Sequence, residues 1–374
     1  MKILIAGDFC PQHRIADKFA HDDFASVLKN VKPVVESADY SIVNFECSIT
    51  KGGEKPIVKL GPNLHCSEKG MEGVKWAGFN CVTLANNHFL DYGTEGVKNT
   101  LAVCRELGID TVGGGMNLQE ASAILYKEIC GNTLAVINCC EHEFSIATET
   151  TAGSNPLNPI QQYYAIKEAH AKADFVLVIV HGGHEHYQLP SPRMVETYRF
   201  FVDAGADAVV NHHQHRYSGY ETYKGKPIFY GLGNFCFDLR HIVLNKKWNY
   251  GYLAEIDFSK EDIHFQLYPY KQCSGQAQVE LLPKESFDTR FDELNSIIAD
   301  KNKLIAATEK YYESSANNSS SIFEPIQNRY YLECKRRGFL PSLISKKRKL
   351  RARNIICCEA HRDKLLWYLN SNKR

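Results

Sequence analysis

Five polar motifs in this chain contain the residue types that bind divalent metal ions. They are Asp8, Asn44 with Glu46, Asn87 with His88, His181 with Glu185, and His213 with His215. Carboxylate, amide and imidazole ligands without a thiolate suit hard-to-borderline divalent cations. Two such ions about 4 Å apart generate a hydroxide and hold the oxygens of a phosphoryl group in line. The motifs therefore predict a site for two divalent metal ions, with Mn, Fe, Zn and Mg all compatible.

The residue types also suggest roles within this scheme. The expected metal ligands are Asp8, Glu46, Asn87, His181, His213 and His215. Either Asp8 or Glu46 could bridge the two ions. His88 could donate a proton to a leaving oxygen, and Asp91 could orient His88. Asn44 and Glu185 complete the candidate catalytic set with His88 and Asp91.

Taken singly, each motif has a simpler explanation. One aspartate after a strand, such as Asp8, is also typical of a turn or a helix cap. We interpret three further histidines, His184, His186 and His212, as ordinary loop residues. The hypothesis of a metal site therefore depends on the five motifs together.

Each motif follows a short apolar run. The runs lie at residues 2–6, 41–43, 81–85, 175–180 and 208–210. Their length and composition favour buried strands. Side chains at the carboxyl ends of strands converge in α/β folds, so the sequence predicts an α/β fold with the motifs at one edge.

Other segments predict the elements between these strands. Apolar spacing favours an amphipathic helix over residues 22–37, and Thr94 begins a helix that runs to about Leu107. Residues 250–258 and 263–270 alternate around a short polar turn, which predicts an antiparallel hairpin. Residues 51–65 are rich in Gly, Lys and Pro and are expected to form a loop that contributes to substrate specificity.

The chain has 374 residues, enough for a large body and an appendage. Residues 301–374 hold 17 Lys and Arg against 6 Asp and Glu, whereas the remainder holds 27 against 37. We expect a catalytic domain over residues 1–275 and a basic, mostly helical region over residues 283–374. The 13 cysteines include no CxxC pair, which favours buried free thiols in a reducing cytoplasm.

The basic region suggests a partner. Residues 335–337 and 346–349 are basic and are interleaved with apolar side chains. This pattern fits a solvated helix face, or attachment to an anionic membrane surface or an acidic partner such as a synthase. No nucleic-acid recognition motif accompanies the charge. The expected location is the cytoplasm, at the periphery of the inner membrane face, since no run of 18 apolar residues and no signal peptide are found.

At these motifs the sequence resembles the CapA family of poly-γ-glutamate and capsule-synthesis proteins, a branch of the calcineurin-like metallophosphoesterases. The resemblance covers about residues 1–260. The matching segments are Asp8, Asn44-Phe45-Glu46, Ala85-Asn86-Asn87-His88 with Asp91-Tyr92-Gly93, His181-x-Gly-x-Glu185, His213-x-His215 and Gly233-Asn234-Phe235.

The resemblance implies a four-layer α/β/β/α sandwich with a dinuclear metal site. It also implies that Asn87 is a ligand, that His88 is catalytic, and that His213 and His215 are ligands. Three positions depart from the pattern. Cys10 stands where the superfamily's Asp-x-His motif has its histidine, Gly182 replaces a tryptophan, and Gln214 replaces a proline.

The sequence thus predicts a metal-dependent hydrolase of the CapA type, acting on a phosphoester in capsule, poly-γ-glutamate or exopolysaccharide synthesis. Two alternatives stay open. One is a non-catalytic accessory subunit of a polymer synthase. The other is a metal-dependent amidase that cleaves γ-glutamyl bonds, because the same hydroxide could attack a carbonyl carbon.

Overall fold

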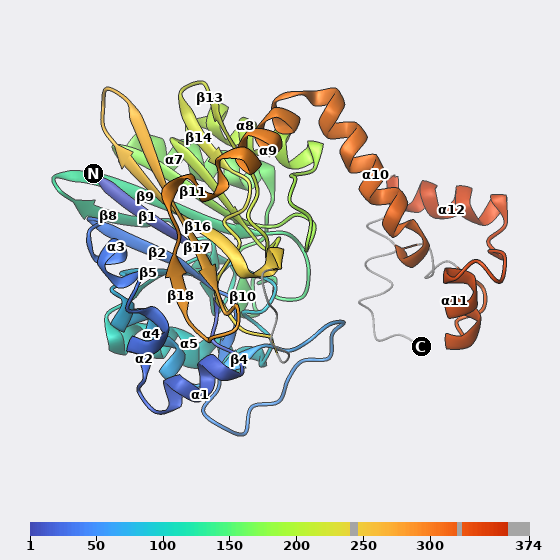
Figure 1. Ribbon diagram of the computed structural model, residues 1–374, viewed down its shortest axis with the longest axis horizontal. Coiled ribbons are helices and arrows are strands. Elements are labelled where there is room, and N and C mark those ends of the chain that lie inside the picture. Colours follow the sequence, from blue (N-terminus) through green and yellow to red (C-terminus); the bar gives the residue numbers. More distant parts are fainter. Residues whose placement is uncertain (240–245, 320–323, 358–374) are drawn as a thin grey trace. The chain divides into compact units, whose positions relative to one another are not determined.

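A computed structural model describes residues 1–239, 246–319 and 324–357. The chain divides into two compact units, Met1–Leu304 and Ile305–Arg374 (Figure 1). The first unit extends beyond residue 275 because helix α9 (Asp288–Ala299) packs on strand β13 (Tyr220–Tyr223). The rings of Phe291 and Tyr220 meet edge to face at 5.4 Å there.

The first sheet of this unit has eight strands, ordered β18-β17-β16-β1-β2-β5-β6 with β15 beside β1. The bounds are β1 Lys2–Cys10, β2 Tyr40–Phe45, β5 Cys81–Thr83, β6 Asp110–Val112, β15 Asn234–Phe237, β16 Tyr250–Phe258, β17 Ile263–Gln272 and β18 Val279–Leu281. Strands β1, β2, β5 and β6 are parallel, so their carboxyl ends share one edge. The antiparallel pair β16 and β17 confirms the predicted hairpin.

The second sheet has six strands, ordered β13-β14-β12-β11-β9-β8. The remaining bounds are β8 Leu125–Ile129, β9 Asn132–Cys140, β11 Phe175–His181, β12 Ala208–His212 and β14 Lys226–Phe229. The four central strands, β9, β11, β12 and β14, are parallel. Every residue of β11 and β12 is buried, as the continuous apolar runs predict for strands that are covered on both faces.

Helices cover the outer face of each sheet (Figure 1). The first sheet packs against α1 (Arg14–Ala20), α2 (Phe24–Leu28), α4 (Lys69–Ala77) and α5 (Gly93–Leu107). The second packs against α7 (Pro159–Lys172) and α8 (Pro192–Ala204). Phe229 of the second sheet contacts Tyr252 and Phe265 of the first, with ring centroids 6.4 and 5.2 Å apart. The predicted four-layer α/β/β/α fold is confirmed.

Short elements complete the first unit. They are α3 Lys32–Glu36, α6 Leu118–Ala121, β3 Ser48–Ile49, β4 His65–Cys66, β7 Gly114–Gly115, β10 Gly153–Ser154, and the 3-10 helices η1 Lys247–Asn249 and η2 Lys284–Phe287. The single helix predicted over residues 22–37 is wrong, since α2 and α3 are separate. Pro33 lies in the first turn of α3, where its ring would clash with the carbonyl of Lys29 in a continuous helix.

The second unit is helical where the structure describes it. Helix α10 (Lys301–Ser319) enters it, followed by α11 (Arg329–Arg336) and α12 (Lys346–Cys357). The buried Glu324 carboxylate pairs with Lys335 at 2.9 Å and accepts hydrogen bonds from Ser342 Oγ and Leu343 N. Residues 358–374 of the predicted basic region lie outside the described residues. None of the helices in the described ranges combines the length and hydropathy of a membrane-spanning segment.

Candidate metal centre

Asp8 reaches the site because β1 passes very close to the chain before β15. A Cβ atom on Gly7 would lie 1.9 Å from the carbonyl oxygen of Gly233, so only glycine fits at position 7. The next amide, that of Asp8, donates to the same carbonyl at 3.1 Å. Asn44 Nδ2 donates to Asp8 Oδ1 at 2.8 Å. Burial opposes ionisation of Asp8, but hydrogen bonding and the charge of nearby histidines, first His215, hold its pKa well below the usual range.

Glu46 follows β2 and is fully buried. Its Oε1 lies 3.4 Å from His181 Nε2 and 3.9 Å from His215 Nε2. Neither carboxylate oxygen has a hydrogen-bond partner among the described residues. Burial and the charge of Asp8 raise the pKa of Glu46 to about 8. A buried carboxylate without hydrogen bonds is costly, which points to a cation as its partner.

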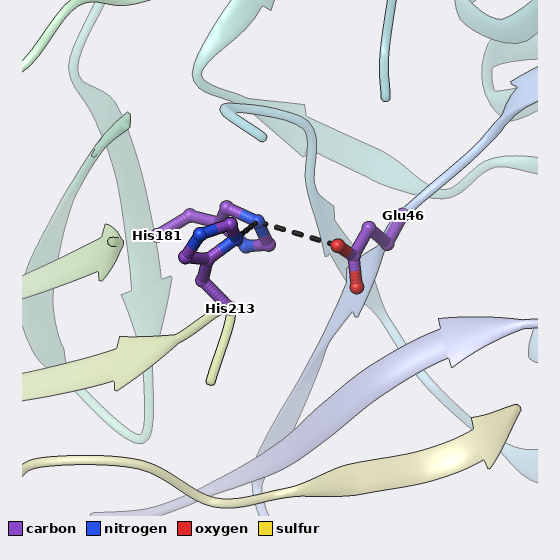
Figure 2. A group of neighbouring side chains, drawn as sticks. All are labelled: Glu46, His181 and His213. Atoms are coloured by element: carbon purple, nitrogen blue, oxygen red, sulfur yellow. Dashed lines mark hydrogen bonds and ion pairs between the residues drawn. The ribbon is translucent and has the colours of Figure 1, made fainter. Parts of the chain in front are cut away.

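His181 ends β11, and His213 and His215 follow β12. These two histidines after β12 have positive φ, 88° at His213 and 53° at His215. The backbone therefore turns sharply here, and both imidazoles lie in the site. His213 Nδ1 and Asn87 Oδ1 each lie 3.0 Å from His181 Nε2. Figure 2 shows the two rings of His181 and His213 facing Glu46. Burial lowers the pKa of His181 to about 4, so this imidazole is neutral at pH 7, the form that binds metals.

The ligand atoms fall into two groups that share one residue. The first group is Glu46, His181 and His213, and the second is Asp8, Glu46 and His215. Within each group all ligand atoms lie within 4.8 Å of one another, and all five residues are buried. Asn87 joins the first group through its contact with His181. The structure therefore brings together all six residues predicted as metal ligands, with Glu46 at the centre, and the donor set fits two hard-to-borderline divalent ions.

His88 and Asp91 lie beside this cluster and are both buried. His88 Nδ1 donates to Asp91 Oδ2 at 2.6 Å, which leaves Nε2 available for a substrate. Lys59, from the loop at residues 51–64, forms an ion pair with Asp91 and lies 3.1 Å from His88 Nδ1. Lys59 could not be identified from the sequence, because this loop has no periodic pattern.

The other two predicted catalytic residues differ in position. Asn44 is buried against the cluster and donates to Asp8, and its Nδ2 lies 3.3 Å from His181 Nδ1. Glu185 lies on the exposed loop after β11 and belongs to neither ligand group. Its charge still influences the pKa of Glu46 and of His215.

Cys10 ends β1 but belongs to the apolar core between the first sheet and its helices. Burial raises the pKa of its thiol, and its nearest hydrogen-bonding neighbour is Cys47, whose sulfur lies 3.6 Å from that of Cys66. Nine of the cysteines in the described residues are buried and free, as expected from the sequence. Cys10 therefore packs with thiols and is in neither ligand group.

Comparison with known proteins agrees with these motifs. Residues 2–239 match the family model "Bacterial capsule synthesis protein PGA_cap". The capsule biosynthesis protein CapA of Bacillus anthracis is 37% identical over 220 residues, covering 57% of this chain and 54% of that protein. The PGA biosynthesis protein CapA of Bacillus subtilis is 34% identical over 221 residues, 57% of each chain.

A more distant relative is a probable polyglutamine synthesis accessory protein of Mycobacterium tuberculosis. It is 27% identical over 235 residues, which cover 58% of this chain and 59% of that protein. The matched region thus spans little more than half the length of these curated relatives. Because the family model covers well over half of the chain and includes every ligand motif, the chain belongs to the PGA_cap family of bacterial capsule synthesis proteins, the CapA family.

Proposed function

We propose that this protein is a metal-dependent hydrolase that cleaves a phosphoester or phosphoanhydride bond during capsule or poly-γ-glutamate synthesis. One observation carries the proposal. The buried Glu46 carboxylate has no hydrogen-bond partner among the described residues and is shared by two groups of ligand atoms. A carboxylate in this position fits a bridge between two cations, which is the arrangement of dinuclear hydrolases.

The residues divide between two ion positions. Asp8, Glu46 and His215 would hold one ion, and Glu46, His181 and His213 would hold the other, with Asn87 as an additional ligand. When bound, such a pair of ions supplies a hydroxide nucleophile and positive charge for the phosphoryl oxygens. Asn44 fixes the orientation of Asp8 by donating to it, and the same side chain packs against Nδ1 of His181.

His88 is the proposed proton donor. Its Nδ1 is occupied by Asp91, so Nε2 is the nitrogen that can deliver a proton to the leaving oxygen. Asp91 holds the ring in that orientation, and Lys59 balances the buried charge of Asp91. We assign Glu185, on the exposed loop after β11, to substrate contact, because it is in neither ligand group.

The accessory role is the second candidate. Cys10 at the third position of the first motif removes one imidazole from the expected ligand set, and the mycobacterial relative is named an accessory protein. An accessory subunit would need no turnover. The amidase alternative uses the same ligands and differs only in its substrate.

The basic helix α12 is the proposed docking element for an anionic membrane surface or an acidic synthase partner. It contains six lysines and arginines and no acidic residue. By contrast, two of the three basic residues of α11 are paired within the unit, Lys335 with Glu324 and Arg336 with Glu333. We place the protein in the cytoplasm, peripheral to the membrane, on this basis.

The proposal is tested by elemental analysis of the purified protein and by hydrolysis of aryl phosphodiesters and monoesters with added Mn²⁺. We expect two ions per chain and turnover that is lost in His213→Ala. His264→Ala is the control, because His264 is an exposed histidine on β17. Two ions without phosphoester turnover would favour the amidase, tested with γ-glutamyl peptides, or the accessory role. A His213→Ala protein that keeps both ions would refute the ligand assignment.

A further inference from the structure

His212 is a buried histidine whose function the scheme above does not use. It is the last residue of β12 and is only 2% exposed. In the parallel pairing of β11 with β12, His212 is the register partner of His181. Partners in a sheet project from the same face, so the His212 ring points to the side on which His181 meets the metal ligands.

Neither ring nitrogen of His212 has a hydrogen-bond partner among the described residues. Buried polar atoms without partners are rare and cost free energy, so an imidazole with two such nitrogens needs an explanation. A buried imidazole with unused nitrogens has the chemistry of a metal ligand.

The nearest charged group to His212 is a predicted ligand. His212 Nδ1 lies 3.5 Å from Asp8 Oδ1, the same distance that separates His215 Nδ1 from Asp8 Oδ2. Two histidines therefore approach Asp8, one at each carboxylate oxygen. The group Asp8, Glu46 and His215 does not include His212, so coordination would require its ring to shift. No hydrogen bond from the described residues fixes the His212 ring in its present orientation.

Of the two proposed ion positions, the one beside Asp8 also has fewer protein ligands. In the Asp-x-His motif of the superfamily a histidine stands two residues after the aspartate, but here Cys10 packs among Cys47 and the core. The ion next to Asp8 is left with three grouped protein ligands. Structural and catalytic sites for divalent ions commonly use at least three protein ligands, and a fourth strengthens binding.

We infer that His212 is a further ligand of the divalent cation held by Asp8, Glu46 and His215, and that it replaces the imidazole missing at position 10. The inference rests on the proposed metal centre. It explains how a chain with Cys10 can still hold two ions, and it assigns separate ions to the neighbours His212 and His213.

The test is calorimetric titration of the chelator-treated, full-length protein with Co²⁺, together with proton NMR of the Co²⁺ form. Each imidazole bound to Co²⁺ gives an exchangeable N–H signal shifted far from the protein envelope. In His212→Gln we expect one of the two ions to bind more than about 100-fold more weakly, a larger loss than outer contacts produce, and one shifted signal to disappear. His264→Gln should match the unaltered protein.

The possible outcomes separate this inference from the proposed function. If His212→Gln keeps both affinities and every shifted signal while His213→Ala loses an ion, the metal centre stands and the role of His212 is refuted. Weaker binding with an unchanged number of signals would also refute it, since His212 would then act through Asp8. If neither variant changes binding, the metal centre itself is refuted. His212→Asn, checked by thermal unfolding without metal, replaces His212→Gln if that variant does not fold.

Discussion

Lys59 and Asp91 form an ion pair in which the side chains are only 2% and 0% exposed. The pair ties a surface loop to the proposed proton donor. The carbonyl of Asp91 accepts from Ile57 N at 2.9 Å, and its Oδ2 accepts from Leu64 N at 2.6 Å. The loop at residues 51–64 thus wraps around Asp91, which in turn orients His88.

Lys59→Met should weaken both stability and turnover. The change leaves the Asp91 carboxylate buried without its cation, which costs about 3 kcal/mol of unfolding free energy. Turnover should fall about 10–100-fold because His88 loses part of its orientation, while metal content stays the same. Denaturant unfolding and aryl phosphodiester hydrolysis measure the two effects. Lys55→Met, at an exposed position in the same loop, is the control. Unchanged turnover in Lys59→Met would show that the pair only anchors the loop.

His88→Ala should slow hydrolysis without releasing metal. Loss of a general acid typically costs about 10²–10⁴-fold in rate. The deficit should be larger for an alkyl phosphoester than for a nitrophenyl ester, because nitrophenolate leaves without a proton. Turnover on both substrates and elemental analysis check this. Equal deficits on both would exclude proton donation by His88, and loss of metal would give His88 a structural role.

The sheet edge where the site lies could be predicted from the sequence, because each polar motif directly follows a short apolar run. The length and composition of apolar runs such as 175–180 favour buried strands, and parallel strands bring the residues after their ends together. Asp8, Glu46 and His215 lie in one ligand group for this reason. The four-layer order came from resemblance to a family, and the two sheets confirm it.

What the sequence could not predict depends on contacts between distant segments. Lys59 lies in an aperiodic loop, so nothing local indicates that its ammonium group is buried against Asp91. His212 faces the ligands as the last residue of β12, and its neighbour His213 reaches them only because the backbone turns there, with φ of 88°. The extent of the first unit depends on Phe291 packing against Tyr220, a contact between segments 71 positions apart.

Metal binding at pH 7 should release protons. Burial and Asp8 raise the pKa of Glu46 to about 8. Burial alone would lower the pKa of His215, but the carboxylates of Glu46 and Asp8 outweigh it and raise the pKa to about 10. Because Glu46 and His215 interact directly, the pair together holds at least one proton at pH 7 in the metal-free protein and must lose it to bind a cation.

At least one proton should leave per chain, and affinity should fall roughly tenfold per released proton for each pH unit of acidification. Calorimetry in buffers of different ionisation enthalpy counts the protons, because the measured heat then changes with the buffer. Binding heat that is the same in every buffer would show that Glu46 and His215 are already deprotonated.

Neutralising α12 should weaken attachment to anionic membranes. Its basic side chains at positions 346–349 are exposed, and each basic residue near an anionic surface contributes about 1 kcal/mol at low salt. Replacing Lys346, Lys347 and Lys349 by Gln should therefore reduce partitioning onto phosphatidylserine vesicles about 100-fold, in line with that contribution. Added salt should remove the difference, since it screens exposed charges. Vesicle cosedimentation measures the effect. The matched control replaces Lys301, Lys303 and Lys310 of α10 by Gln, which removes the same charge from another helix.

Equal loss of vesicle binding in both variants would mean that net charge alone drives binding. No loss in either variant would show that α12 is an ordinary solvated surface.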